Sequence, residues 1–422
     1  MSVREKRIAV VGGGVSGITV AHLLDPGHRV TLYEKNDYVG GHTHTIAIPN
    51  GPDAGTAVDT GFIVFNDRTY PNFQKLLGRL GATALKSDMS FSYFDERSGY
   101  QYASRNLDGL FAQRRNLLNT AHLRMIGDIL RFNRLVRRQM QDGLLGDRTL
   151  GAFLQQYRFG DAFRQRYVLP MVSAIWSAPH DTAGDFPMQT FARFFNNHGL
   201  LTIRDQPQWY VVEGGSSAYV DAFCRGFGGE IHTSSPIKAI SRDAEGATVT
   251  LSDGTRRRHD HVVIATHADE ALALLADPST EERRWLGPWQ YSRNQVVVHT
   301  DAAWMPSNPR AWASWNYLRK PGASSDPVVL TYHMNRLQRL KTRRQYFVTL
   351  NPPEDIDPAH VIRRLVYTHP VFTFSSMVTQ THLPVLNGAR HTHFCGSYFN
   401  YGFHEDAVTA GAAVAADFGA TL

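Results

Sequence analysis

The most constraining feature of the sequence is a glycine-rich turn between an apolar run and a helical pattern. Residues 8–17 read IAVVGGGVSG, and the apolar spacing of a helix continues to Leu24. A second apolar run, residues 28–33, ends at Glu34, twenty residues after Gly14. A strand, a tight turn and a helix in this order place backbone N–H groups and the positive end of a helix dipole at one point. The pattern therefore predicts a site for the pyrophosphate of a dinucleotide in a parallel α/β sheet.

Each residue type in this turn has a physical reason. Gly12 and Gly14 have no Cβ to obstruct a phosphate, and Gly17 lets the helix pack closely on the strand. Glu34 can accept hydrogen bonds from both ribose hydroxyls and would repel a 2′-phosphate, which disfavours NADP. A chance glycine cluster would not explain the correctly spaced acid. The expected cofactor contacts here are Gly12, Gly14, Val15, Ser16, Gly17, Glu34 and Lys35.

A glycine doublet, Gly40-Gly41, follows Glu34 after five residues. With the first turn it resembles the signature of the flavin amine oxidase superfamily, which includes monoamine and polyamine oxidases, protoporphyrinogen oxidase and phytoene-type desaturases. The resemblance implies FAD as the cofactor, with contacts from Gly41, His42 and Thr43. The family usually has Arg where this chain has His42, so His42 would make a weaker, pH-dependent contact with the pyrophosphate.

Later segments resemble the same superfamily. Residues 58–65 match its Asp-x-Gly segment near the flavin ring, and residues 209–217 match the turn that leads back to the cofactor domain. Residues 235–266 are similar to the second half of a glutathione-reductase-type FAD domain, and residues 392–411 to the turn and final helix at the pyrimidine edge of the flavin. Ser397 stands where the family has an acid. The resemblance implies contacts from Gly61, Phe62, Ile237, Ala265, Thr266, Gly396, Ser397, Gly402, Phe403 and His404.

The order of these segments predicts an α/β protein with a glutathione-reductase-type FAD-binding Rossmann domain and an interleaved α+β substrate domain. The FAD domain would be discontinuous, with residues 1–80, 205–267 and 388–422. The substrate domain would comprise residues 81–204 and 268–387. A chain of 422 residues suits two linked domains better than one core.

Composition limits the compartment and the partners. The net charge is +6, which suits anionic ligands or an anionic membrane surface, and no nucleic-acid motif accompanies it. No stretch approaches the roughly 20 apolar residues that cross a bilayer, and no signal peptide precedes the first strand. We therefore expect a cytoplasmic protein, with peripheral contact at the inner membrane face as an option. Two distant cysteines, Cys224 and Cys395, predict buried thiols and no metal site, although Cys395 is close enough to the expected flavin to allow a covalent bond.

A basic amphipathic helix is predicted from about residue 106 to residue 141. Its apolar face consists of Met125, Ile129, Phe132, Val136 and Met140, and its basic face of Arg124, Arg131, Arg134 and Arg138. The favoured interpretation is a helix that packs on the core with a solvated basic face. The alternative is a helix on a membrane surface, with the apolar face among acyl chains and the arginines on lipid phosphates.

The substrate is expected to be hydrophobic. Residues 167–195 are rich in aromatic side chains and Met, which is typical either of core or of the lining of a long apolar cavity. The superfamily's oxidases often carry a lysine ten residues before a Trp, and here Asn294 precedes Trp304 by ten, which weakens an amine oxidase. The whole chain resembles bacterial flavoproteins related to the desaturase of furan fatty acid synthesis. This resemblance implies dehydrogenation of a methyl-branched unsaturated acyl chain of a phospholipid.

For the chemistry, hydride would pass to the flavin and a proton to His404 or Tyr401, which are both expected near the ring. His404 could equally be a packing residue at a helix start. Asp59 is expected to fix its turn, and His267 to cap a helix that begins at Ala268. The alternatives are an amine or polyamine oxidase, a non-redox FAD-dependent lipid hydratase or isomerase, and a lipid-binding scaffold with a structural flavin. The oligomeric state is not predicted.

Overall fold

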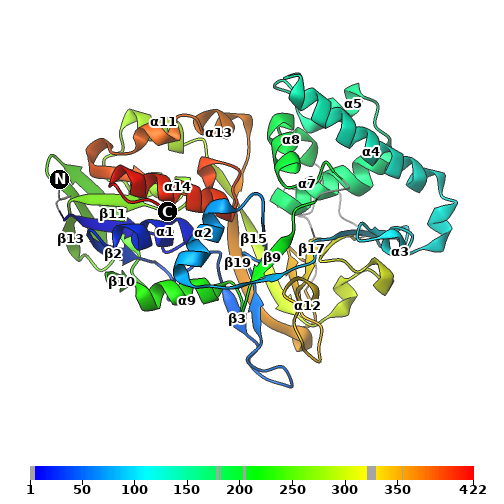
Figure 1. Cartoon of the computed structure of the whole chain (residues 1–422), viewed down its shortest axis with the longest axis horizontal. Coiled ribbons are helices and arrows are strands. Elements are labelled where there is room, and N and C mark those ends of the chain that lie inside the picture. Colours follow the sequence, from blue (N-terminus) through cyan, green and yellow to red (C-terminus); the bar gives the residue numbers. More distant parts are fainter. Residues whose placement is uncertain (1–4, 177–179, 181, 203–205, 321–328, 354) are drawn as a thin grey trace.

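The computed structural model describes residues 5–176, 180, 182–202, 206–320, 329–353 and 355–422. Two large sheets organise these residues, and Figure 1 shows both chain ends in the same half of the molecule, with N at its outer end and C near α1 and α14. A group of helices, α4, α5, α7 and α8, lies at the opposite end of the molecule.

The first large sheet is entirely parallel, with strand order β10-β2-β1-β14-β20. Its strands are β1 (Arg7–Val11), β2 (Arg29–Tyr33), β10 (Glu230–His232), β14 (His261–Ile264) and β20 (Thr392–Phe394). Side chains of β1 alternate between two cores: Ile8 and Val10 join one core, whereas Ala9 and Val11 join the other. Both faces of the sheet are therefore covered, which explains why β1 reads as an unbroken apolar run.

One face of this sheet carries helices and the other a meander. The helices are α1 (Val15–Leu24), α2 (Pro71–Leu80), α9 (Ser217–Gly226) and α14 (His404–Asp417). The meander consists of β11 (Ile237–Asp243), β12 (Gly246–Leu251) and β13 (Arg256–His259), which pair antiparallel. This arrangement confirms the predicted Rossmann-type FAD domain with a glutathione-reductase-type second half.

The second large sheet has strand order β19-β15-β18-β17-β16-β7-β8 and is antiparallel except for the β16–β7 pair. Its strands are β7 (Phe91–Asp95), β8 (Tyr100–Ala103), β15 (Gln290–His299), β16 (Trp315–Arg319), β17 (Val329–His333), β18 (Phe347–Leu350) and β19 (Val361–Val371). Two small sheets complete the strands: β3 (Thr45–Ala47) with β4 (Ala57–Asp59), and β9 (Trp209–Val212) between β5 (Phe65–Asn66) and β6 (Ala84–Lys86). The fold class is therefore the predicted α/β architecture with an interleaved α+β part.

The domain bounds stay a prediction. The parallel sheet draws its strands from residues 7–33, 230–264 and 392–394, and the mixed sheet from residues 91–103 and 290–371. The predicted boundary at residues 204–205 lies outside the described residues, as does Ser177 in the aromatic segment.

The predicted long basic helix is broken into three pieces. These are α3 (Leu107–Leu110), a 3₁₀ turn η1 (Arg114–Leu117) and α4 (Thr120–Gln141), which begins where the side chain of Asn119 accepts hydrogen bonds from two backbone N–H groups. The sequence pattern missed this cap. The further helices are α5 (Leu150–Gln156), α6 (Asp161–Phe163), α7 (Leu169–Trp176), α8 (Met188–Asn197), α10 (Ala268–Leu274), α11 (Thr280–Leu286), α12 (Met334–Leu337) and α13 (Phe374–Thr379).

The apolar face of α4 is buried in the protein. Met125, Phe132 and Val136 have no exposed surface, while Arg124 and Arg134 are exposed. The core-packing interpretation of this helix is therefore confirmed, and the alternative in which this face enters a membrane is wrong. Among the described residues, no helix is long and apolar enough to span a bilayer.

Candidate functional site

The glycine turn after β1 and the glycine doublet lie against each other. Gly40 donates its backbone N–H to the Gly13 carbonyl at 2.8 Å. A Cβ on Gly41 would lie 3.2 Å from Gly14 Cα, and a Cβ on Gly17 would lie 2.0 Å from the Gly12 carbonyl oxygen. A Cβ therefore has no room at Gly17, and at Gly41 it would be tight and strained by the positive φ of 59°.

The N-terminus of α1 is open and bare. Gly14 is the N-cap residue and makes no side-chain cap, and a Cβ built on it would meet no atom within 4 Å. No side chain caps the first N–H groups of this ten-residue helix, which lie at the positive end of its dipole. This cradle fits the pyrophosphate of a dinucleotide, which needs close backbone donors and no side chain in the way.

Glu34 closes the cradle from the end of β2. Its side chain is only 5% exposed, Oε2 accepts from Gly13 N at 2.8 Å, and Oε1 accepts from Asn36 N at 2.8 Å. Each oxygen keeps a second lone pair, so the carboxylate could still accept from a ribose. Lys35 turns outward and pairs through Nζ with Glu270 Oε1 at 2.6 Å.

Two other predicted contact segments adjoin the same region. A Cβ on Gly12 would lie 2.8 Å from the Ala265 carbonyl oxygen, which places the end of β14 and Thr266 beside the first turn. Ser235 donates its N–H to the Glu34 carbonyl at 2.8 Å, two residues before Ile237. The structure thus brings the first turn, β2, β14 and the start of β11 together, as the sequence predicted.

A histidine cluster, His42, His267 and His369, lies where the two large sheets meet. The ring centroids of His42 lie 5.4 Å from His369 and 6.0 Å from His267. His42 comes directly after the doublet, His267 follows β14, and His369 belongs to β19. Burial, the largest cause, lowers the pKa of His42 well below its usual range and lowers that of His369 to about 4. It also lowers the pKa of His267, so all three imidazoles are neutral at physiological pH.

His42 has an unused nitrogen. Its ring hydrogen-bonds the Thr368 backbone, whereas Nε2 is buried without a hydrogen-bond partner among the described residues. A buried polar atom of this kind needs an explanation, and a group bound beside the glycine doublet would supply one. The sequence singled out His42 but missed His369, because β19 meets the cradle only through its pairing with β15.

Asn294 occupies the position at which the resemblance raised the question of a lysine. It is 2% exposed, its Nδ2 lies 3.1 Å from His369 Nδ1, and its Oδ1 accepts from Asn351 Nδ2 at 2.8 Å. These amide contacts hold His369 in place. The structure describes all seven lysines, and none of them is buried. A buried lysine ammonium group is therefore absent from this chain.

The N-terminus of α14 is closed by side chains. Phe403 N donates to Asp406 Oδ2 at 2.8 Å, and burial raises the pKa of Asp406 to about 7. The His404 ring stacks on Phe62 at 3.6 Å, and its Nε2 lies 2.8 Å from the hydroxyl of Tyr219. Burial lowers the pKa of His404 to about 3, so this imidazole is neutral and tightly held.

Thr43 and Gly61 join the His404 side of the site, whereas Tyr401 lies apart. Thr43 Oγ1 lies 2.6 Å from the Tyr219 hydroxyl, and a Cβ on Gly61 would lie 2.2 Å from the His42 carbonyl oxygen. Tyr401 instead lines a surface cavity of about 530 Å³. Other residues of that cavity are Arg68, Tyr70, His198, Phe403 and Asp406. The two predicted proton acceptors, Tyr401 and His404, thus have different surroundings.

The remaining predictions at this site have mixed outcomes. Asp59 accepts from Ser216 N at 2.7 Å and from Thr45 Oγ1 at 2.6 Å, so it fixes its turn as expected. His267 is the N-cap residue of α10 but makes no side-chain cap, because its ring stacks on Tyr291 at 4.3 Å instead.

The two cysteines differ. Cys395 is buried, and burial raises its pKa to about 12, whereas Cys224 is only half-buried, so the prediction of two buried thiols is wrong for Cys224. Near Cys395, Gly396 packs with its Cα against the Tyr398 ring, since a Cβ there would lie 2.6 Å from that ring. Gly402 has φ 89°, a left-handed conformation that suits glycine before α14. Ser397, whose N-terminal neighbour is Gly396, begins a 3₁₀ turn that ends at Phe399.

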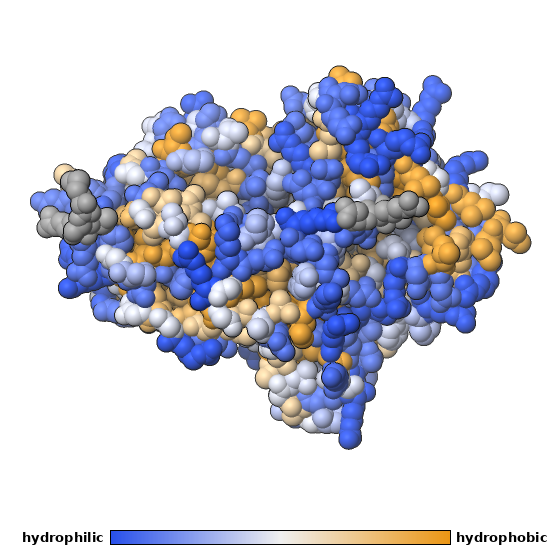
Figure 2. Space-filling view, viewed as in Figure 1, coloured by the Kyte–Doolittle hydropathy of each residue, from blue (hydrophilic) through white to orange (hydrophobic). Residues whose placement is uncertain are grey.

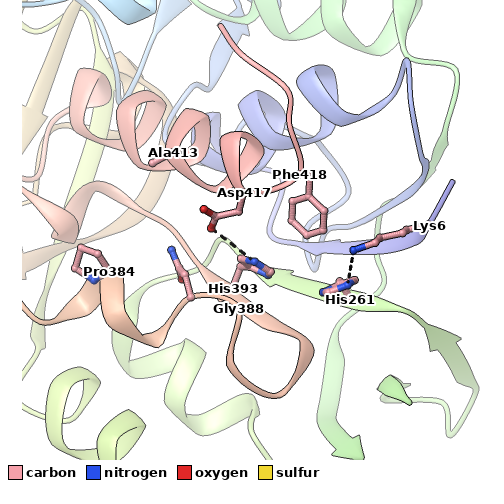
Figure 3. A pocket seen from close by; sticks show the side chains of 9 residues that line it. Lys6, His261, Pro384, Gly388, His393, Ala413, Asp417 and Phe418 are labelled. Carbon is pink, nitrogen blue, oxygen red and sulfur yellow. Dashed lines mark hydrogen bonds and ion pairs between the residues drawn. The ribbon is translucent and has the colours of Figure 1, made fainter. Parts of the chain in front are cut away.

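A further cavity of about 470 Å³ lies at the other end of α14 (Figure 3). Its charged groups satisfy one another: Lys6 Nζ lies 3.1 Å from His261 Nε2, and His393 Nε2 lies 3.7 Å from Asp417. It contains none of the predicted site residues, and it opens at the edge of the parallel sheet opposite to the glycine turn. We therefore place the functional site at the cradle and the α14 N-terminus.

The parallel sheet, the bare helix start and the interleaved mixed sheet define a dinucleotide-dependent oxidoreductase with a Rossmann-type domain. The family model described as flavin containing amine oxidoreductase matches residues 15–418, and the chain belongs to this family. The protein is therefore an FAD-dependent oxidoreductase.

Individual relatives are distant. The L-amino-acid oxidase of Siganus canaliculatus is 24% identical over 302 residues, which cover 66% of this chain and 53% of that protein. The chain thus spans about half the length of this relative. The 15-cis-phytoene desaturase of Narcissus pseudonarcissus is 40% identical over 75 residues, which cover 18% of this chain and 12% of that protein.

Solved structures share the fold over nearly the whole chain. A putrescine oxidase bound to putrescine covers 98% of both chains with a TM-score of 0.71 and 16% identity. A fatty acid isomerase from P. acnes that produces CLA covers 98% of both chains with a TM-score of 0.69 and 15% identity. At these identities the likeness shows the fold alone.

Proposed function

We propose that this protein dehydrogenates a hydrophobic substrate, a methyl-branched unsaturated fatty acyl chain of a phospholipid. The observation that carries the proposal is the aromatic surrounding of the α14 N-terminus. Phe403 stacks on Phe194 at 4.6 Å, and Phe194 lies 4.8 Å from Trp176. Aromatic surface of this kind beside the flavin would exclude water and would bind an acyl chain by burial of apolar surface.

The polar groups beside this wall favour the same substrate class. An ammonium substrate calls for a carboxylate or an aromatic cage with access to it. Asp59 is already saturated by protein donors, and Asp406 holds the N–H of Phe403. Asn294 and the histidine cluster are neutral, so this part of the site attracts neither a cation nor an anion strongly.

For the cofactor, the bare N-terminus of α1 would hold the pyrophosphate of FAD, and Glu34 the ribose. His42 would offer Nε2 to the same region, and the start of α14 would face the flavin's pyrimidine edge. Bound FAD supplies the acceptor for a hydride or its equivalent. The protein's own part is to orient the chain and shield the reacting carbons, and the proton that the substrate loses is released to solvent.

Neither predicted proton acceptor, Tyr401 or His404, has the properties of a general base. Burial raises the pKa of Tyr401, so its hydroxyl already carries its proton at neutral pH. A buried imidazole whose pKa lies at about 3 holds a proton poorly, and Nε2 of His404 is engaged with Tyr219. His404 would then act through packing, because its ring fills the space between Phe62 and Tyr219. His404→Gln should therefore lower FAD retention more than Tyr401→Phe, and Tyr401→Phe should leave turnover close to that of the wild type.

The test is an anaerobic titration of the purified flavoprotein. Phospholipid with methyl-branched unsaturated chains should bleach the flavin band near roughly 450 nm. Mass spectrometry should show a product two hydrogens lighter. The same phospholipid with straight saturated chains is the control and should leave the flavin oxidised.

Two other functions have specific support. The curated relatives and the putrescine oxidase structure favour an amine or amino-acid oxidase, and bleaching by amines but not by lipid would establish it. The fatty acid isomerase structure favours a non-redox lipid enzyme. In that case the lipid product would have the mass of its substrate, and the flavin would stay oxidised at the end of the reaction.

A further inference from the structure

A patch of exposed leucines lies at the tip of the helical part. We call it the leucine tip, and it consists of Leu107, Leu117, Leu118 and Leu123. Their side chains are 75%, 51%, 89% and 44% exposed. Figure 2 shows a hydrophobic area at the end of the molecule where Figure 1 places α3 and the start of α4. Contiguous apolar surface of this kind on a folded protein marks an interaction site.

The leucine tip is held from below by a fixed backbone. The side chain of Asn106 accepts from Gly109 N at 2.8 Å, and Asn308 Nδ2 donates to the Ala112 carbonyl at 2.8 Å. Asn116 and His122 are buried beneath the tip. Since the intervening turns are anchored in this way, the leucines are directed outward by the fold rather than by a loose loop.

Positive charge is concentrated in the same segment. Residues 105–138 hold eight arginines and two aspartates, with no lysine or glutamate. They therefore carry a net charge of +6, equal to that of the whole chain, and the rest of the chain balances with 36 basic and 36 acidic residues. All eight arginines are exposed.

Several of these arginines border the leucines directly. Arg114 and Arg115 precede Leu117 within η1, and Arg124 follows Leu123 in α4. Arg114 is partly neutralised by Asp108, at 2.5 Å, but no second acid stands in residues 105–127. Apolar side chains with a basic border match the two layers of an anionic membrane surface, acyl chains and phosphates.

We propose that the leucine tip docks this protein on the surface of an anionic phospholipid bilayer. The leucines enter the boundary of the acyl chains, and the arginines bind lipid phosphates. A second copy of the chain is a poorer occupant, because a two-fold contact would place one basic border against another. The inference extends the proposed function, which needs a lipid substrate, but docking is measured without turnover.

The experiment is sedimentation of the flavoprotein with vesicles of phosphatidylglycerol and phosphatidylcholine that carry straight, monounsaturated chains. Binding should exceed that to pure phosphatidylcholine by about 10-fold or more at low salt and should weaken as salt rises. The double variants Leu117→Glu/Leu118→Glu and Arg115→Glu/Arg124→Glu should each lower the partition coefficient by about 10-fold or more.

Matched controls use exposed residues elsewhere. Val378 and Val385 are 65% and 68% exposed, so Val378→Glu/Val385→Glu controls for loss of apolar surface. Arg256→Glu/Arg257→Glu on β13 controls for loss of charge. Both controls should bind vesicles like the wild type, and all variants should keep the wild-type FAD content and thermal midpoint.

Three results would overturn the proposal. They are equal binding to neutral and anionic vesicles, unchanged binding by both tip variants, and a solution mass that falls to the monomer only in the tip variants. The last result would assign the patch to a second copy of the chain. Vesicle binding without flavin bleaching by the branched lipid would leave the docking surface intact and reject the proposed substrate.

Discussion

Two helices of the parallel-sheet domain present their N-termini to the functional site in opposite ways. The start of α1 is bare: its N-cap residue is Gly14, and a Cβ built on Gly14 would meet no atom within 4 Å. The start of α14 is filled: Asp406 accepts from Phe403 N, and the His404 ring lies on Phe62. Both ends carry the same dipole and the same unpaired N–H groups.

The difference separates two kinds of recognition. At α1 no side chain caps the helix start, so the donors for a ligand are backbone N–H groups. Recognition of the pyrophosphate there depends on the absence of side chains that would block it. At α14 buried polar side chains fill the helix start. The carboxyl group of Asp406 accepts a hydrogen bond there. The bare start of α1 depends only on residues that are neighbours in the sequence. The filled start of α14 depends on residues that are distant in the sequence and bury its side chains.

The largest effect should come from Asp406→Asn, which tests the filled end. Burial raises the pKa of Asp406 from 3.8 to about 7, so between these values the folded protein keeps a proton that the unfolded chain has lost. The stability contributed by this group is complete below the unfolded pKa and is lost as pH rises through the folded pKa. Relative to Asp406→Asn, the wild type should lose up to about 4 kcal/mol of unfolding free energy between pH 4 and pH 8.

Urea unfolding of both proteins at several pH values measures this loss. The side-chain amide introduced by Asp406→Asn cannot ionise, and its oxygen can still accept from Phe403 N. Parallel pH profiles for the two proteins would show that the carboxyl group at the filled end is not strained by burial.

The next largest effect should come from Gly14→Val, which fills the bare end. The Cβ of Val meets no atom within 4 Å in the apoprotein, but the side chain takes the space of the pyrophosphate. Loss of two charge-assisted hydrogen bonds predicts about 100-fold weaker FAD binding, roughly 2.7 kcal/mol. Gly27→Val is the matched control, since its Cβ also meets no atom within 4 Å, and fluorescence titration of apoprotein with FAD compares the two. Equal affinities would refute an open cradle at α1.

Asn294→Ala tests the part of the site that the mixed sheet contributes through side chains. It removes partners from His369 and Asn351, and the cost of such unpaired buried groups predicts a loss of about 2 kcal/mol in unfolding free energy. Since Asn294 lies in the part of the site that is built from side chains and not in the backbone cradle at α1, FAD affinity should change by less than about 3-fold. A drop in FAD affinity as large as that of Gly14→Val would mean that the two parts of the site are not separable.

The smallest effect should come from Lys35→Met. Its partner Glu270 lies on the surface, with side chains 60% and 39% exposed, and pairs of this kind contribute little. FAD affinity should stay within about 2-fold of the wild type. A larger change in the same fluorescence titration would give Lys35 the cofactor contact that the sequence predicted.

The sequence predicted the parallel sheet and the closeness of the glycine segments because both rest on local spacing, and the resemblance to a known superfamily predicted FAD. Glu34 follows Gly14 at a fixed distance, and the glycines tolerate no other residue where backbones touch. His369 escaped prediction because only the pairing of β15 with β19 brings it to His42. The leucine tip escaped for another reason: Leu117 and Leu118 lie outside the helical period that selected Met125 and Phe132.

Side-chain contacts also explain the errors of detail. His267 is the N-cap residue of α10, but its imidazole ring stacks on the ring of Tyr291 and makes no side-chain cap. The break between η1 and α4 follows from Asn119, whose side chain competes for the backbone N–H groups of the next turn. These choices depend on neighbours that are remote in the chain or on one polar side chain within a helical pattern.

The parallel sheet joins the first and the last residues of the chain, and this has a consequence for the timing of assembly. The strand at one edge is β20, and α14 packs so closely on α1 that a Cβ on Gly411 would lie 2.6 Å from the Ser16 carbonyl oxygen. During synthesis the glycine turn leaves the ribosome long before α14, the helix that packs on α1. We therefore expect stable cofactor binding only after α14 has been made and has packed on α1.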